Sequence, residues 1–166
     1  MPAAERYDLA SAIDRWVVGN FLAWLGDYSR RQGGALGSYS INLSAASIGE
    51  ESFLDFVLAA IERHGVPAQL ICFEITETSA IANLNKAIVF MQRLKDIGCQ
   101  FALDDFGSGL SSFAYLKSLP VDFLKIDGVF VKDIVADPIA RAMVASINTI
   151  GHEMGLQTVA EFVETE

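Results

Sequence analysis

The chain has 166 residues, of which 52% are hydrophobic, and it carries a formal net charge of −9. This length fits one domain or part of one, and the apolar content is ample for a buried core. The negative charge disfavours nucleic acid and anionic lipid as partners, because both would be repelled. The sequence contains no apolar run that could span a bilayer and no leader pattern, so we expect a cytoplasmic location, either of the whole protein or of the cytoplasmic portion of a membrane-bound parent.

Hydrophobic periodicity predicts helices and strands in alternation along the chain. In the first helix, apolar side chains recur at three- and four-residue steps from Leu9 to Tyr28, and we expect Trp16 and Trp24 in its core-facing stripe. Later helices are predicted near residues 53–61, 87–95, 111–119, 129–135 and 138–150. Strands are predicted near residues 39–43, 70–75, 100–103, 123–126 and 157–160. Such alternation specifies parallel strands joined by helical crossovers.

The two faces of each predicted strand favour a barrel. Residues two places apart on a strand share a face, and a small or apolar side chain lies beneath the polar residue at each strand end. These lower residues are Ser40, Cys72, Ala102, Phe123 and Val159. The pattern suits a (β/α)8 TIM-type barrel, which usually needs about 250 residues. About five parallel strands with helical crossovers therefore predict an incomplete barrel or an open sheet.

Two cysteines, Cys72 and Cys99, lie in or near strand-like runs. They form neither a disulfide framework nor a zinc-binding pattern. We expect both to be buried thiols of the core.

Polar side chains stand at the predicted strand ends, and they are Asn42, Glu74, Asp104, Asp105, Lys125 and Glu161. The C-terminal ends of parallel strands gather on one rim, so separate segments would bring four carboxylates, an amide and an amine together. Hard oxygen ligands without cysteine or histidine favour magnesium or manganese over zinc. The sequence therefore predicts a divalent-metal site with an amine beside it.

This set of groups suits phosphodiester hydrolysis, in which two divalent ions about 3.5–4 Å apart can activate water and neutralise charge on phosphorus. An adjacent pair such as Asp104 and Asp105 can direct one carboxylate to each ion. Two nearby cations would disfavour the charged form of Lys125, which suits either a proton acceptor or a water-orienting group. Taken singly, these residues have ordinary explanations, since an Asp-Asp pair before glycine is most often a turn or a helix cap.

Several segments also follow one another in the order and spacing of a known family. They are Pro2–Glu5, Asn42–Ser44, Phe73–Glu77, Asp104–Gly109, Ser111–Phe113, Leu124–Asp127, Ala160-Glu161 and Val163–Thr165. On these segments the chain resembles the EAL domain family, the bacterial phosphodiesterases for cyclic di-GMP, over essentially its whole length.

The resemblance implies roles for individual residues. The implied metal ligands are Asn42, Glu74, Asp104, Asp105 and Glu161, with Asp105 on the second ion and Asp104 as the bridging ligand. Lys125 resembles the residue that helps to activate the attacking water, and Glu164 is placed with Lys125 and Asp105 among the catalytic residues. Glu77 resembles the anchor of the loop after Asp105. The implied cofactors are two divalent cations, magnesium or manganese, with calcium as an inhibitor.

The chain also departs from the family pattern. The namesake Glu-Ala-Leu strand is expected before Pro2, and the family's last strand is expected after Glu166, so residues 1–166 are predicted to be a partial EAL domain that is inactive alone. Phe162 stands where the family usually has glycine. A phenylalanine is expected to crowd the rim beside Glu161, since glycine allows closer backbone approach.

The resemblance predicts hydrolysis of cyclic di-GMP to the linear dinucleotide by a larger bacterial signalling protein. A cyclic di-GMP receptor without catalysis, or an interaction module, is the alternative. The other implied partners are a second copy of the chain, bound through the loop and helix after Asp105, and GGDEF or sensory domains in the parent protein.

Overall fold

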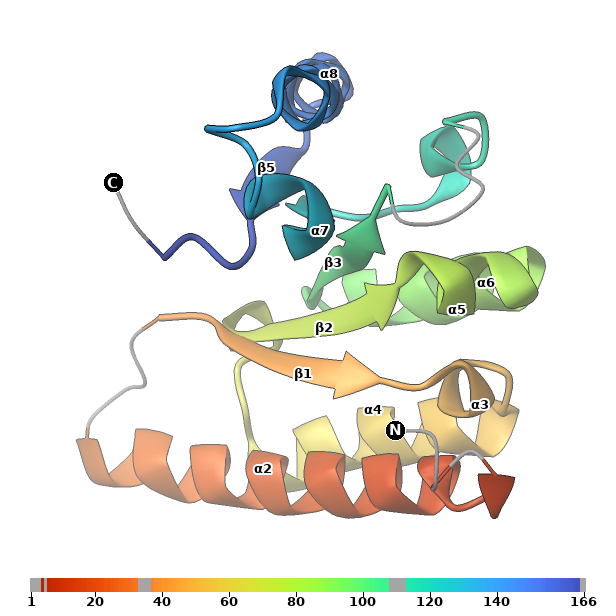
Figure 1. Cartoon of the computed structure of the whole chain (residues 1–166). Coiled ribbons are helices and arrows are strands. Elements are labelled where there is room, and N and C mark those ends of the chain that lie inside the picture. Colours follow the sequence, from red (N-terminus) through yellow and green to blue (C-terminus); the bar gives the residue numbers. More distant parts are fainter. Residues whose placement is uncertain (1–3, 5, 33–36, 108–112, 165–166) are drawn as a thin grey trace.

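The computed structural model describes residues 4, 6–32, 37–107 and 113–164. The described residues form one parallel sheet in the order β1-β2-β3-β4-β5. The strands are β1 (Tyr39–Leu43), β2 (Ile71–Thr76), β3 (Gln100–Phe106), β4 (Phe123–Ile126) and β5 (Gln157–Ala160). Figure 1 shows them fanning from β1, above α2, to β5, below α8. The strand order follows the chain order, as the predicted incomplete barrel requires.

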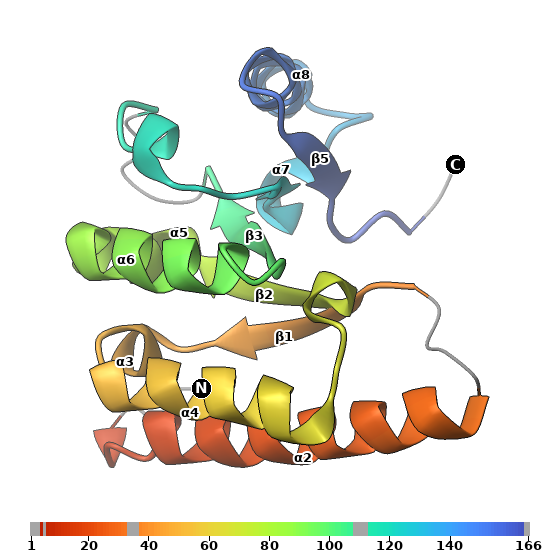
Figure 2. The ribbon, with the colours of Figure 1, turned by 180° about the vertical axis from the view of Figure 1, so that it is seen from behind.

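Helices connect successive strands and cover the sheet. They are α2 (Ala10–Gln32), α3 (Ala45–Ile48), α4 (Glu51–His64), α5 (Glu77–Ala82), α6 (Leu84–Lys95), α7 (Gly128–Val131) and α8 (Pro138–Glu153), with 3-10 turns η1 (Ala68–Leu70) and η2 (Leu116–Ser118). Seen from behind, α2 and α4 run side by side beneath β1, and α5 and α6 lie next to each other beside β2 and β3 (Figure 2). Within the described part of the chain, no helix is both long and apolar enough to cross a membrane.

The two faces of the sheet differ as predicted. One face contributes the core, where Ile41, Ile71, Phe73, Phe101, Leu103 and Leu124 are buried. The other face lines a hollow of about 270 Å³ with Ser40, Cys72, Glu74, Ala102, Phe123, Lys125 and Val159. Strand parity therefore places Glu74 and Lys125 on the inner face of the partial barrel. Ala160, on the opposite face to Val159, is exposed because β5 ends the described sheet.

The buried stripe of α2 differs from the predicted one. Trp16 and Trp24 are 69% and 50% exposed, so the prediction that they belong to the core is wrong. The residues that α2 buries are small or aliphatic, apart from one carboxylate: Ala10, Asp14, Val18, Leu22, Leu25 and Gly26.

Close packing between α2 and α4 explains this difference. A Cβ on Gly26 would lie only 2.5 Å from the carbonyl oxygen of His64, so the contact requires glycine. Arg30 Nη1 donates a hydrogen bond of 2.9 Å to the same oxygen. Small residues permit this approach, and the large aromatic rings turn outward, where Trp24 stacks on Tyr28 with ring centroids 5.4 Å apart.

Other helix boundaries were predicted with mixed success. Gly65 ends α4 in the left-handed conformation with φ of 62°, and Asp137 caps α8 by accepting a 2.8 Å hydrogen bond from the amide of Ile139. The short helices α3 and α5 were not predicted, and the helix expected over 129–135 is shortened to α7. Part of the helix expected over 111–119 lies outside the described residues, and the described part contains only η2.

Both cysteines are free and buried, as predicted. Burial raises the pKa of Cys72 to about 12, with a further contribution from the Glu74 carboxylate. Burial likewise raises the pKa of Cys99 to about 12. Neither thiol ionises near neutral pH, so both act as apolar core groups.

Candidate metal centre

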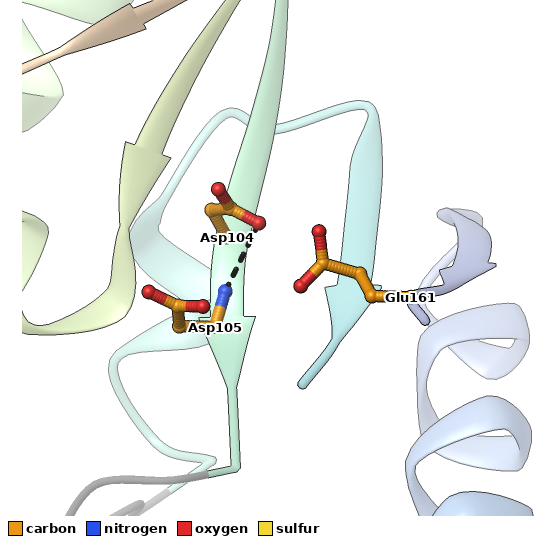
Figure 3. Close-up of side chains that lie close together, drawn as sticks. All are labelled: Asp104, Asp105 and Glu161. Atoms are coloured by element: carbon orange, nitrogen blue, oxygen red, sulfur yellow. Dashed lines mark hydrogen bonds between the residues drawn. The ribbon is translucent and has the colours of Figure 1, made fainter. Parts of the chain in front are cut away.

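Three carboxylates gather at the C-terminal rim of the sheet. Asp104 and Asp105 lie near the end of β3, and Glu161 directly follows β5. One carboxylate oxygen from each residue lies within 4.8 Å of the others. Figure 3 shows the Glu161 carboxylate turned toward the two aspartates. The structure therefore brings together residues that are more than fifty positions apart in the sequence.

The ammonium group of Lys125, from β4, joins this cluster to a fourth carboxylate. Its Nζ lies 2.7 Å from Glu74 Oε2, 2.8 Å from Asp104 Oδ1 and 2.9 Å from Glu161 Oε1. The four side chains are only 12–19% exposed. Burial opposes the charged ammonium, but the hydrogen bonds to Asp104, Glu74 and Glu161 outweigh it and raise the pKa of Lys125. The sequence predicts the opposite, a lowered pKa of Lys125. That prediction assumes two neighbouring cations, whose charge would counter that of the carboxylates.

An irregular strand end aims the two aspartates in different directions. The pairing of β3 with β4 shifts register between Leu103 and Phe106, and Asp105 adopts a positive φ of 54°. Such irregularities re-aim side chains beside functional sites. The amide of Asp105 donates a 3.1 Å hydrogen bond to Asp104 Oδ1. The pKa of the Asp105 carboxyl is raised, mainly by partial burial and to a smaller extent by repulsion from Asp104 and Asp127.

Two predicted site residues lie at the margin of the cluster. Asn42 is exposed on β1 and is the register partner of Glu74 on β2, which places it one strand away from the Lys125 contacts. Glu164 is exposed beyond β5. Among the described residues, Glu164 does not belong to the group of closely spaced carboxylates.

Glu77, predicted as a loop anchor, is 1% exposed at the start of α5. Its carboxylate accepts a 3.1 Å hydrogen bond from the amide of Gly107 and another from the hydroxyl of Tyr115. Burial and this bond to Glu77 raise the pKa of Tyr115. Glu77 therefore holds both flanks of the segment that follows Asp105; residues 108–112 of that segment lie outside the described residues.

Substituting Glu77 with alanine should loosen the end of β3. We expect faster hydrogen exchange at the Gly107 amide and a loss of about 2 kcal/mol in the free energy of unfolding, because two donors lose a buried acceptor. Glu77→Gln, which keeps an acceptor oxygen and the side-chain shape, should lose less. An unchanged exchange rate at Gly107 in Glu77→Ala would contradict the anchoring role.

Asp14 is a buried carboxylate that the sequence analysis missed. Its Oδ2 accepts hydrogen bonds from the Ser44 amide (2.8 Å), the Ser44 hydroxyl (2.7 Å) and the Ser47 hydroxyl (2.6 Å). Ser44 caps α3 and follows Asn42 by two residues. Asp14 therefore ties α2 to the turn after β1. Its four-residue spacing from Ala10 and Val18, on the buried stripe of α2, is the sequence signal that could have identified it.

Replacing Asp14 with alanine should destabilise the protein by about 3 kcal/mol, since three donors lose a charged acceptor in a buried position. Chemical denaturation would measure this loss, and the exposed Asp55→Ala on α4 provides the control. Equal unfolding midpoints for Asp14→Ala and Asp55→Ala would refute the prediction.

The Phe162 side chain does not separate Glu161 from the cluster. Glu161 keeps its 2.9 Å contact with Lys125, while the ring of Phe162 packs against Gly128 at the start of α7. Phe162 therefore occupies space beside α7 and does not displace Glu161 from the rim.

The donor set of the rim fits a hard divalent cation. Carboxylate oxygens of Asp104, Asp105 and Glu161 are close enough to share an ion. Glu74 is joined to this group by its ion pair with Lys125. Lys125 places one positive charge within this group of carboxylates. Oxygen ligands of this kind suit magnesium, manganese or calcium.

The chain belongs to the EAL domain family, whose sequence profile matches residues 1–166. It is 42% identical to the cyclic di-GMP phosphodiesterase PdeB of Shewanella oneidensis over 165 residues, which is 99% of this chain and 19% of PdeB. The chain thus spans about a fifth of that relative's length.

Solved structures of the family have the same arrangement of elements. The PaMucR phosphodiesterase in complex with c-di-GMP superimposes with a TM-score of 0.90 at 33% identity, covering 99% of this chain and 66% of that one. The FimX EAL domain from Pseudomonas aeruginosa bound to c-di-GMP gives 0.87 at 31% identity, covering 98% and 64%. Both neighbours are therefore longer than this chain.

Proposed function

We propose that the chain forms the catalytic region of a phosphodiesterase that hydrolyses cyclic di-GMP to the linear dinucleotide. The observation that carries this proposal is the cluster of Glu74, Asp104 and Glu161 around Lys125, with Asp105 beside it. Membership in the EAL domain family and the phosphodiesterase activity named for its relatives support the substrate and the reaction.

The proposed cofactors are two divalent cations, magnesium or manganese. In this proposal Asn42, Glu74, Asp104 and Glu161 would hold the first ion and Asp105 the second, with Asp104 available to both. When bound, the ions would supply charge neutralisation at the phosphodiester and lower the pKa of water. Calcium, whose coordination is longer and looser, should support binding of the dinucleotide but not its hydrolysis.

Side chains of the protein would orient the attacking water and transfer protons. Lys125 Nζ points into the carboxylate cluster, where it can orient a water molecule or exchange a proton with it. Glu77, itself bonded by the hydroxyl of Tyr115, accepts a hydrogen bond from the Gly107 amide next to the strand end that presents Asp105. We propose for Glu164 the catalytic role that the family resemblance implies, and Glu164→Gln in the same hydrolysis assay would test it.

We further propose that residues 1–166 are part of a domain whose barrel is completed by strands pairing with β1 and β5. Both strands are edges of the described sheet, and five strands do not close a barrel of this type. The isolated chain should therefore be inactive. In the isolated chain, the open edges should favour association. For the complete domain we propose a homodimer through the loop and helix after Asp105, and an apolar groove of about 560 Å³ lined by Phe106 and α8 supports a contact on that side. Cytoplasmic location and attached GGDEF or sensory domains remain part of this proposal.

The test is incubation of the full-length protein with cyclic di-GMP and Mg²⁺ or Mn²⁺, with products separated by anion-exchange chromatography. We expect the linear dinucleotide to accumulate, and no product in Ca²⁺ or EDTA. Asp104→Asn should abolish hydrolysis, while Asp96→Asn, at the C-terminus of α6, serves as a surface control. Binding without hydrolysis in Mn²⁺ would instead identify a receptor, and loss of both would identify an interaction module.

A further inference from the structure

Phe162 occupies an unusual backbone conformation directly after the proposed metal ligand Glu161. Its φ is 52°, in the left-handed region that bulky L-residues rarely adopt. A conformation of this kind persists only where the surroundings hold it, so the contacts of the Phe162 ring are informative.

Those contacts are made with α7. A Cβ built on Gly128 would lie 2.1 Å from Cδ2 and 2.8 Å from Cγ of Phe162, so the ring fills the space that a side chain at position 128 would need. The ammonium of Lys132, at the C-terminal end of α7, lies 4.3 Å from the ring centroid. Both ends of this short helix therefore contact the ring.

The Glu161 carboxylate is held by Lys125 Nζ at 2.9 Å, and the backbone that carries it lies just past the last strand of the described sheet. Glu161 lies one residue beyond β5, and its amide donates a 3.3 Å hydrogen bond to the carbonyl oxygen of Ile126. Phe162, Val163 and Glu164 are exposed. By contrast, the start of α7 is well fixed, because Asp127 caps the Val129 amide at 2.8 Å and its own amide donates to Phe106.

We infer that Phe162 and Gly128 form a size-matched pair that positions the Glu161 carboxylate in the metal centre. This inference rests on the proposed role of Glu161 as a metal ligand. Because the ring packs on Gly128, the well-fixed β4–α7 junction restrains Phe162 and, through the backbone, Glu161. Phe162 is thus a positioning residue, acting through Glu161.

The pairing explains why position 128 is glycine. The φ of Gly128 is not positive, unlike that of Gly107 or Gly155, so its backbone would accept alanine. The ring of Phe162 is what excludes a methyl group at position 128. A Gly128→Ala substitution should therefore be harmful only while Phe162 is present.

A double-mutant cycle in the full-length protein tests this dependence. The variants are Gly128→Ala, Phe162→Gly and their combination, with Mn²⁺ affinity measured by electron paramagnetic resonance of the free ion. We expect Gly128→Ala to weaken Mn²⁺ binding about tenfold in the parent, but less than about threefold in the Phe162→Gly background. The urea midpoint of the metal-free protein should show the same dependence. Gly49→Ala is the matched control, since its Cβ would meet nothing closer than 3.5 Å.

Equal weakening by Gly128→Ala in both backgrounds would overturn the inference, as would unchanged Mn²⁺ affinity in Gly128→Ala or no Mn²⁺ binding by the parent. Mn²⁺ affinity separates a positioning role from a purely structural one, because the latter would change only the urea midpoint. If the cycle shows the expected dependence and cyclic di-GMP is not hydrolysed, the proposed function fails while the positioning role stands.

Discussion

Replacing Lys125 with methionine is expected to lower the free energy of unfolding of the metal-free protein by about 3 kcal/mol. The substitution removes the ammonium that lies within 2.9 Å of Glu74, Asp104 and Glu161. Those carboxylates are largely shielded from water, so without the ammonium they would repel one another. Urea denaturation in EDTA would measure the loss, and the exposed Lys117→Met provides the control.

Divalent ions should reverse this destabilisation. A cation bound by the same carboxylates takes over the charge of the lost ammonium, so saturating Mn²⁺ should raise the midpoint of Lys125→Met more than that of the parent. Hydrolysis should nevertheless stay low, because the amine proposed to orient the attacking water is missing. A Lys125→Met protein that Mn²⁺ fails to stabilise would indicate that the carboxylates do not bind metal.

Substituting Asp105 with asparagine should reduce cyclic di-GMP hydrolysis by about 100-fold or more, because the proposed second ion would lose its carboxylate. Binding of cyclic di-GMP in Ca²⁺ should remain within about threefold of the parent, since interactions needed mainly in the transition state affect turnover more than affinity. Paired hydrolysis and binding titrations would measure both quantities. Full hydrolytic activity in Asp105→Asn would exclude the two-ion assignment.

The same variant should be more stable than the parent when metal is removed. The pKa of Asp105 is raised in the folded protein, so folding favours the protonated form. Stability from this group therefore falls as pH rises through the folded pKa, and above that pKa the ionised carboxylate opposes folding. Asparagine removes that charge, and the urea midpoint in EDTA at pH 7 should rise. The difference between the two proteins should shrink as the pH is lowered below the unfolded pKa.

Most of the sheet and the rim was predictable from the sequence because both depend on short-range periodicity. Alternation along each strand placed Glu74 and Lys125 on the inner face, and parallel order then brought them to one rim with Asp104 and Glu161. These inferences need only strand direction and parity.

The errors arose where packing between distant segments decides the outcome. Hydrophobicity assigned Trp16 and Trp24 to the core, whereas close contact at Gly26 rotates the buried stripe toward smaller residues. The orientation of Phe162 likewise depends on Gly128, which lies 34 positions earlier in the printed sequence. Neither contact leaves a periodic signal in the sequence.

The most direct measurement of the metal centre is an anomalous-scattering crystal structure of the full-length protein grown with Mn²⁺. Two Mn²⁺ peaks are expected at the rim, one contacting Asn42, Glu74, Asp104 and Glu161 and the other contacting Asp104 and Asp105. Rim carboxylates that remain bound to Lys125 alone at saturating Mn²⁺, or Mn²⁺ located elsewhere in the protein, would contradict the assignment of this rim as the catalytic metal site.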